Sequence, residues 1–223
     1  MKKNKFGKFY CKIVLTGGPC AGKSTAQRLI ADRILADFSD RWRVFVVSEA
    51  SSLLYKGRVK RAAMNEVQVE QWQEDILRTI IQLENVYEHI AENEELRNTI
   101  IICDRGAMDP KAYATEDQWC RILEKVGVTE QDILARYQYV IQIAIAPREY
   151  YIGIQNNPYR RESFEEAQEK DEKYNLIWKD HPNLIKITNE QATHNLEEGW
   201  NKKFADIFEV IQQILSKANG SNY

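Results

Sequence analysis

A short stretch near the amino terminus constrains this chain more than any other feature. Residues Gly17–Ser24 spell Gly-Gly-Pro-Cys-Ala-Gly-Lys-Ser, which fits the pattern G-x-x-x-x-G-K-[ST]. The stretch follows an apolar run that ends at Thr16 and precedes a helical pattern through Ile30. Glycines let the backbone N–H groups of such a turn curl around phosphates, and the helix N-terminus adds positive potential. A chance glycine-rich turn would not need all eight positions, so the sequence predicts a nucleoside triphosphate site.

The residues of this stretch receive specific roles. Lys23 is expected to reach the β- and γ-phosphate oxygens, and the Ser24 hydroxyl is expected to bind Mg²⁺. We expect the bound nucleotide to be ATP or GTP. The choice between them stays open because no motif in the sequence distinguishes adenine from guanine. The residues expected to bind the nucleotide are Gly17, Gly18, Pro19, Cys20, Ala21, Gly22, Lys23, Ser24 and Thr25, together with Asn189 near the base.

Short β-rich apolar runs alternate with longer stretches of helical period along the rest of the chain. This alternation predicts parallel strands joined by helical crossovers, and apolar strands imply helices on both faces of the sheet. We therefore expect an α/β fold, a three-layer α/β/α sandwich around a five-stranded parallel sheet, and we assign it the strand order 2-3-1-4-5 that is typical of kinases. One domain should span residues 1–223. The expected strands are Tyr10 to Thr16, Val44 to Ser48, Thr99 to Asp104, Tyr139 to Ile145 and Leu184 to Thr188.

Composition excludes several classes of function. The 31 Lys and Arg residues nearly balance the 33 Asp and Glu residues, so no global field favours a nucleic acid partner. The four cysteines show no paired spacing, and no apolar run is long enough to cross a membrane. We therefore expect a cytoplasmic protein, with peripheral attachment to membranes as the alternative.

Polar residues follow two of the expected strands. Asp104 ends a buried strand and is expected to complete the Mg²⁺ site with Ser24, and the Arg105 that follows it is typical of kinases rather than motor ATPases. Glu49 follows another strand, where its carboxylate could accept a proton from a substrate hydroxyl as general base, anchor the substrate, hold a metal-bound water or simply be solvated.

Weaker candidates surround this edge of the sheet. Gln73 and Arg78 lie on a long helical pattern and could face an acceptor together with Glu49 and Arg105. Asn189 follows the last expected strand, where loops often border the nucleotide base. A basic cluster, Arg58, Lys60 and Arg61, is expected to be a solvated face, with an anionic acceptor or lipid headgroup as the alternative.

The segment 147–166 is expected to form a mobile lid. It contains Arg160 and Arg161, just before a capping-box pattern that begins at Ser163 and opens a helix. Closure of such a lid would bring guanidinium groups onto the transferring phosphoryl group, where they stabilise developing charge. The alternative is a solvated basic turn.

Several stretches together resemble the P-loop domain of the TRPL translocation defect protein family. That domain belongs to the AAA_28 group and is similar to the ribosylnicotinamide-kinase domain of NadR-type regulators. The resemblance implies a kinase-like P-loop fold that binds ATP or GTP with Mg²⁺, and it implies trafficking or phospholipid partners. The relatives carry a further C-terminal domain, whose functions are not carried over. The stretches are Lys12–Thr25, Ser48–Ala50, Leu77–Asn85, Ile101–Asp109 and His181-Pro182.

These observations favour a phosphotransferase that acts on a small hydroxylated, nucleoside-like acceptor. In this hypothesis the catalytic groups are Lys23, Glu49, Asp104, Arg105 and one or both lid arginines. The rival is a regulatory switch that binds GTP or ATP and hydrolyses it slowly or not at all. A hexameric motor is disfavoured because no Glu follows Asp104.

Overall fold

The computed structural model describes residues 1–151, 163–189 and 195–218. Its centre is a parallel sheet in the order β3-β4-β2-β5-β6, which confirms the predicted order 2-3-1-4-5. A short strand that was not predicted, β1 (Lys2–Lys3), pairs antiparallel with the first half of β2. The parallel strands are β2 (Phe9–Thr16), β3 (Trp42–Val47), β4 (Asn98–Asp104), β5 (Tyr139–Ile143) and β6 (Leu184–Ile187).

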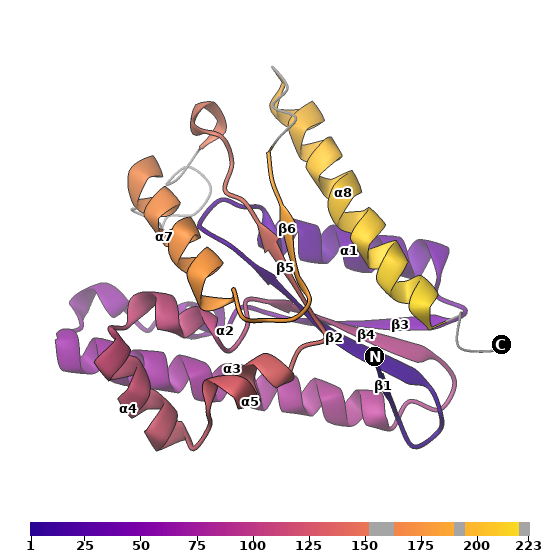
Figure 1. The fold of residues 1–223 in the computed structure, drawn as a ribbon, viewed down its shortest axis with the longest axis horizontal. Helices are drawn as coiled ribbons and strands as arrows, with labels where there is room; N and C mark the ends of the chain where they lie inside the picture. The colour runs from indigo at the N-terminus through magenta and orange to yellow at the C-terminus, as the bar shows by residue number, and fades with distance from the viewer. Residues whose placement is uncertain (152–162, 190–194, 219–223) are drawn as a thin grey trace.

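Helices cover both faces of the sheet, which confirms the three-layer α/β/α prediction. Figure 1 shows α1 and α8 on one side and α3, α4 and α5 on the other, while α7 stands near the carboxyl ends of the strands. The helices are α1 (Lys23–Asp37), α2 (Ala50–Lys56), α3 (Glu66–Glu92), α4 (Glu116–Val126), α5 (Glu130–Ala135), α7 (Phe164–Ile177) and α8 (Leu196–Lys217). Short 3₁₀ turns are η1 (Arg61–Ala63), η2 (Asp109–Tyr113) and η3 (Arg148–Tyr150).

The central strand β2 builds two cores because its successive side chains point to opposite faces. Cys11, Ile13 and Leu15 pack with α1 and α8, whereas Tyr10 and Val14 pack with α3. All of these side chains are buried. The apolar run therefore fixes β2 at the centre of the sheet, and its end at Thr16 delivers the phosphate-binding loop.

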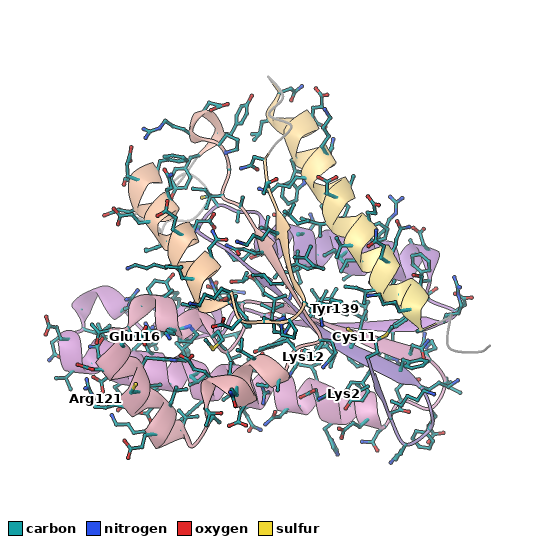
Figure 2. All side chains as sticks on the ribbon, in the orientation of Figure 1. Lys2, Cys11, Lys12, Glu116, Arg121 and Tyr139 are labelled. Atoms are coloured by element: carbon teal, nitrogen blue, oxygen red, sulfur yellow. The ribbon has the colours of Figure 1, made fainter. Side chains whose placement is uncertain are left out.

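Lys12 is a charged residue at a core position on the α3 side of β2 (Figure 2). Its ammonium lies 2.9 Å from Glu84 and 3.0 Å from Glu88, both on α3. Glu84 also accepts hydrogen bonds from Arg136 and from the Tyr137 hydroxyl. A buried charge requires partners of this kind, because desolvation would otherwise neutralise it or unfold the chain.

This network reaches the loop that follows β4. The Tyr137 hydroxyl oxygen accepts the backbone N–H of Ala107 at 2.7 Å, and burial raises the pKa of Tyr137 well above its usual range. Glu84, Tyr137 and Ala107 thus form a chain of hydrogen bonds from α3 to the backbone just after Arg105. These hydrogen bonds to Tyr137 and Glu84 therefore fix the position of the loop that carries Arg105.

Capping side chains set where several helices begin. Ser163 Oγ accepts a hydrogen bond from the N–H of Glu166 at 3.2 Å, and the Glu166 carboxylate accepts one from the N–H of Ser163. This capping box confirms the predicted helix start. Strand β5 ends at Ile143, two residues earlier than expected. In the described part of the chain, no helix has the length and apolar character needed to span a bilayer.

Candidate functional site

The phosphate-binding loop has left-handed backbone at two glycines. Gly17 has φ +128° and Gly22 has φ +88°. A Cβ at Gly17 would lie 2.1 Å from the carbonyl oxygen of Ile143, and one at Gly22 would lie 2.3 Å from the Trp200 ring. Neither position accepts another residue unless β5 or α8 moves, so the pattern of glycines follows from both conformation and packing.

Positive charge and open N–H groups gather at this loop. The Lys23 ammonium is buried and donates to the carbonyl oxygens of Gly17 and Gly18 at 2.9 and 2.7 Å. Helix α1 begins with no side-chain cap and no acidic residue in its first turn. These features suit a polyphosphate anion. Pro19, Cys20 and Ala21 complete the loop, and Thr25 lies in the first turn of α1.

Ser24 and Asp104 lie together, as predicted for a magnesium site. The pairing of β2 with β4 places Asp104 opposite Leu15, and the Ser24 hydroxyl donates to Asp104 Oδ2. Burial raises the pKa of Asp104, while the charge of Lys23 opposes that shift. A hydroxyl and a carboxylate are ligands that Mg²⁺ accepts, so these residues fit the ion. No group of three metal-binding side chains gathers within the described ranges, so a bound Mg²⁺ would rely on phosphate and water for its other ligands.

Glu49 lies two residues after the end of β3, at the N-cap position of α2, and faces Arg105. Arg105 Nε donates to Glu49 Oε1 at 2.8 Å, and the Ser52 hydroxyl donates to Oε2 at 2.6 Å. Burial alone would raise the pKa of the Glu49 carboxyl, but Arg105 and Ser52 outweigh burial and lower it to about 2. The carboxylate is therefore ionised at neutral pH, and it is a weak base.

Arg105 takes a strained backbone conformation to reach this position. Its φ is +71°, which costs a non-glycine residue on the order of 1 kcal/mol. The guanidinium lies 5.0 Å from the centre of the Tyr174 ring and 3.7 Å from Asp109. Strain at this point is offset by the ion pair with Glu49, so the fold holds this guanidinium beside the loop.

A pocket of about 140 Å³ joins the loop to these charged groups. Pro19 of the phosphate-binding loop, Glu49, Arg105 and Gln73 all line it, so three of the four residues assigned to an acceptor share one cavity. Aromatic and apolar side chains form most of the remaining wall: Ala50, Tyr55, Trp72, Ile76, Ile80, Pro110 and Tyr113.

Arg78 and one member of the basic cluster, Arg61, differ from what the sequence suggested, whereas Arg58 and Lys60 are exposed as predicted. Arg78 bonds to Glu74 and to the carbonyl oxygen of Lys125 on α4, and it is not part of the pocket wall. Arg61 was expected on a solvated face, but it lines the pocket with its guanidinium 5.1 Å from the Tyr113 ring centre. The 3₁₀ turn η1 explains the difference, because it folds Arg61 back towards α2.

One face of α7 and the residue that follows it contact three parts of the site. Asp171 Oδ1 accepts the N–H of Gly18 at 2.7 Å. One turn later the Tyr174 hydroxyl donates to the Tyr113 hydroxyl at 3.1 Å, and Trp178 Nε1 donates to Asp109 Oδ1 at 2.6 Å. These α7-face residues, Asp171, Tyr174 and Trp178, connect the phosphate-binding loop to the wall of the pocket.

Asn189 lies beside the loop but its amide bonds within the protein. Its Nδ2 donates to the carbonyl oxygen of Ile145 at 2.6 Å, and its Oδ1 accepts from the Lys203 ammonium at 2.9 Å. Burial lowers the pKa of Lys203 to about 8, although nearby Asp171 opposes the shift. The geometry makes Asn189 a brace between β5 and α8. The predicted lid arginines, Arg160 and Arg161, lie outside the described residues.

Several of these residues received no role from the sequence. Asp109 ends the stretch Ile101–Asp109 quoted above, and its buried carboxylate accepts from Thr16 and Trp178. Nothing in the spelling around Asp171 marks it, since it is one of several acids on a charged helix. Only the packing of α7 on the loop gives it a role.

The family comparison covers most of the chain. The AAA_28 family, described as an AAA domain, matches residues 12–195. A search of curated proteins finds no match to this sequence.

Solved structures with the same fold include kinases. Thymidylate kinase from Ehrlichia chaffeensis is similar with a TM-score of 0.58 and 14% identity, covering 91% of this chain and 99% of that one. A NadR protein in complex with NAD and AMP-PNP has a TM-score of 0.58 and 12% identity, with 92% of this chain covered and 49% of that one. A NadR protein in complex with NR has a TM-score of 0.57 and 15% identity, covering 92% and 51%. The chain thus spans about half of each NadR chain.

Proposed function

Because this chain belongs to the AAA_28 family and has a P-loop kinase-like fold, we propose that it is a Mg²⁺-dependent phosphotransferase. It moves the γ-phosphoryl group of ATP or GTP to a small hydroxylated, nucleoside-like acceptor. One observation carries the proposal: the pocket is lined at once by Pro19 of the phosphate-binding loop and by the Glu49–Arg105 pair. A hydroxyl held there lies beside the place where the triphosphate would end.

In the proposed reaction the acceptor oxygen forms a bond to the γ-phosphorus while the bond to the β,γ-bridging oxygen breaks. The products are a phosphorylated acceptor and a nucleoside diphosphate. Lys23 stabilises the negative charge that grows on the bridging and γ-oxygens. Ser24 and Asp104 would hold Mg²⁺, which would neutralise charge on the phosphates.

The proposed role of Glu49 follows from its low pKa of about 2. Its carboxylate accepts a hydrogen bond from the acceptor hydroxyl and orients the oxygen. Such a weak base takes the proton only once the new bond to phosphorus has largely formed, which suits a loose transition state. The proton then passes to solvent. Orientation, rather than early proton removal, is the main contribution of this residue.

The decisive experiment is transfer of radiolabelled γ-phosphate to a panel of nucleosides, nucleoside monophosphates and ribosylnicotinamide. We expect transfer to at least one acceptor, abolished by Lys23→Ala and reduced by Glu49→Gln, because the amide can still accept a hydrogen bond from the hydroxyl but cannot take its proton. Glu124→Gln, at an exposed position on α4, is the matched control and should leave transfer unchanged. Transfer that persists unaltered in Lys23→Ala would refute the proposal.

The same assay separates the enzyme from the rival switch. Tight binding of triphosphate over diphosphate, with no transfer to any acceptor, would favour a regulatory switch. The narrower resemblance to the TRPL translocation defect protein family stays a prediction, as do the phospholipid or trafficking partner and the roles of Arg160 and Arg161. Titration with liposomes in the presence of each nucleotide tests the membrane partner.

A further inference from the structure

We infer that Gln73 recognises the edge of a flat heterocycle in the molecule that receives the phosphoryl group. That edge carries a hydrogen-bond donor next to a hydrogen-bond acceptor. The inference rests on the proposed function and narrows its acceptor to a nucleoside or a similar compound with a carboxamide-bearing ring. It assigns a specificity-determining role to one side chain of α3.

The first observation is that Gln73 is a largely buried residue whose side-chain amide lacks a protein partner in the described part of the chain and keeps contact with the pocket space. Its side chain is 3% exposed and lines the pocket. Among the described residues, it takes part in no side-chain hydrogen bond, ion pair or ring contact. The amide is not among the fully enclosed polar atoms that lack a partner, so it faces the pocket, where a ligand could supply its hydrogen bonds.

The other polar groups of the pocket already have partners. Glu49 bonds to Arg105 and Ser52, and Asp109 accepts from Thr16 and Trp178. A carboxylate has further lone pairs, so Glu49 can still accept the hydrogen bond from the acceptor hydroxyl proposed above, but neither carboxylate needs a ligand to be satisfied. The Gln73 amide, by contrast, depends on a ligand for its hydrogen bonds.

The pocket wall near this amide suits an aromatic ring. Tyr55 and Trp72 stack with their ring centres 5.6 Å apart and an angle of 23° between their planes. Tyr113 also lines the pocket. Trp72 directly precedes Gln73 on α3, while Ile76 and Ile80 extend the apolar lining by one and two turns. Flat rings pack well on aromatic faces of this kind.

An amide group is the natural match to a heterocyclic edge because it carries a donor and an acceptor side by side. Asparagine and glutamine form paired hydrogen bonds with nucleobase edges for this reason. A sugar or a peptide backbone would bond to the Gln73 amide but would leave the aromatic wall without a flat partner, and a lipid tail would leave the amide without a hydrogen bond. The combination therefore favours an aromatic base or carboxamide.

Two pairs of ribosides isolate this contact. Inosine and purine riboside differ in the oxo group and its neighbouring N–H, and ribosylnicotinamide and ribosylpyridine differ in the carboxamide. Titration calorimetry with the AMP-PNP and Mg²⁺ complex of the full chain should show the edge-bearing member of at least one pair binding about tenfold or more tighter.

Substitution then assigns the preference to the residue. Gln73→Leu removes both hydrogen-bonding atoms and should bring the ratio of that pair to about one, with little change for the edge-free member. Gln73→Glu keeps the shape but loses the donors, and should also reduce the ratio. Gln71→Leu, at an exposed position on the same helix, is the matched control and should keep the wild-type ratio. Affinity for AMP-PNP reports whether each variant is folded.

Three results would overturn the inference: no binding of either pair, equal affinities within both pairs for the wild-type protein, or a ratio that survives Gln73→Leu. The first two results come from the wild-type protein, and only the third requires the Gln73→Leu variant to fold. If AMP-PNP binding still requires Lys23 and phosphate still reaches another acceptor, the proposed function stands and only the role of Gln73 is lost. If AMP-PNP binding is unaffected by Lys23→Ala, the proposed function itself fails.

Discussion

Replacement of Glu49 by glutamine should destabilise the protein in a manner that depends on pH. The folded-state pKa of this carboxyl is about 2, against an ordinary value of 4.5. Each unit of difference corresponds to about 1.4 kcal/mol, so the ionised form is favoured in the fold by roughly 3 kcal/mol at most. The side chain is 26% exposed, and solvent screening reduces the expected contribution to about 2 kcal/mol.

The sign follows from the direction of the shift. Because the pKa of Glu49 is lowered on folding, its contribution is fully present above pH 4.5 and is lost as the pH falls towards 2. Glutamine keeps the shape and accepts one hydrogen bond from Arg105, but it cannot balance the guanidinium charge. The difference between the two proteins should therefore shrink in acid.

Urea unfolding of wild type and Glu49→Gln, followed by circular dichroism from pH 7 down to pH 3.5, measures this difference. We expect about 2 kcal/mol near neutral pH and a steady decline below about pH 4.5. Glu124→Gln at the exposed position should change the free energy of unfolding by less than about 0.5 kcal/mol. A difference that stays constant with pH would show that the ion pair with Arg105 does not set the ionisation of Glu49.

Three further predictions concern other charged groups. Glu84→Leu removes the main partner of the buried Lys12 ammonium and should lower the free energy of unfolding by about 3 kcal/mol or more, measured by urea denaturation; a loss below about 1 kcal/mol would mean that the ammonium reaches water. Asp171→Ala should speed hydrogen exchange at the Gly18 amide, followed by NMR, since its acceptor is gone; unchanged exchange would rule out a persistent bond. The ε-carbon resonance of Lys203 should titrate near pH 8, and the protein should gain stability as the pH rises from there towards 10.5, because the folded state releases this proton first; a midpoint above pH 10 would contradict the burial of this ammonium.

The sheet and the phosphate-binding loop could be predicted because local sequence determines them. Apolar runs of strand length, separated by helical periods, predicted the strands, and strand ends differed from expectation by up to two residues. The strand order came from the kinase-like character of the chain and is confirmed. Helices α4 and α5 were not predicted, although Thr115 and Thr129 begin capping patterns that could have revealed them.

The acceptor pocket could be predicted only in part. Glu49 and Arg105 were recognisable because polar residues after parallel strands meet at one edge of the sheet. Tyr55 lies on the short helix α2, and Arg61 and Tyr113 lie on 3₁₀ turns, so tertiary packing rather than local sequence brings them to one cavity. The burial of Lys12 likewise could not be predicted, because it depends on the ion pairs with Glu84 and Glu88 of α3.

Helix α7 has a consequence for how the two substrates would influence each other. Asp171 holds the loop where the triphosphate would bind, and Tyr174 and Trp178 hold residues beside the acceptor cavity. A ligand that shifts this helix at either end changes the free energy of binding at the other. Thermodynamic linkage then requires the effect to be reciprocal: nucleotide strengthens or weakens acceptor binding by the same factor as acceptor changes nucleotide binding.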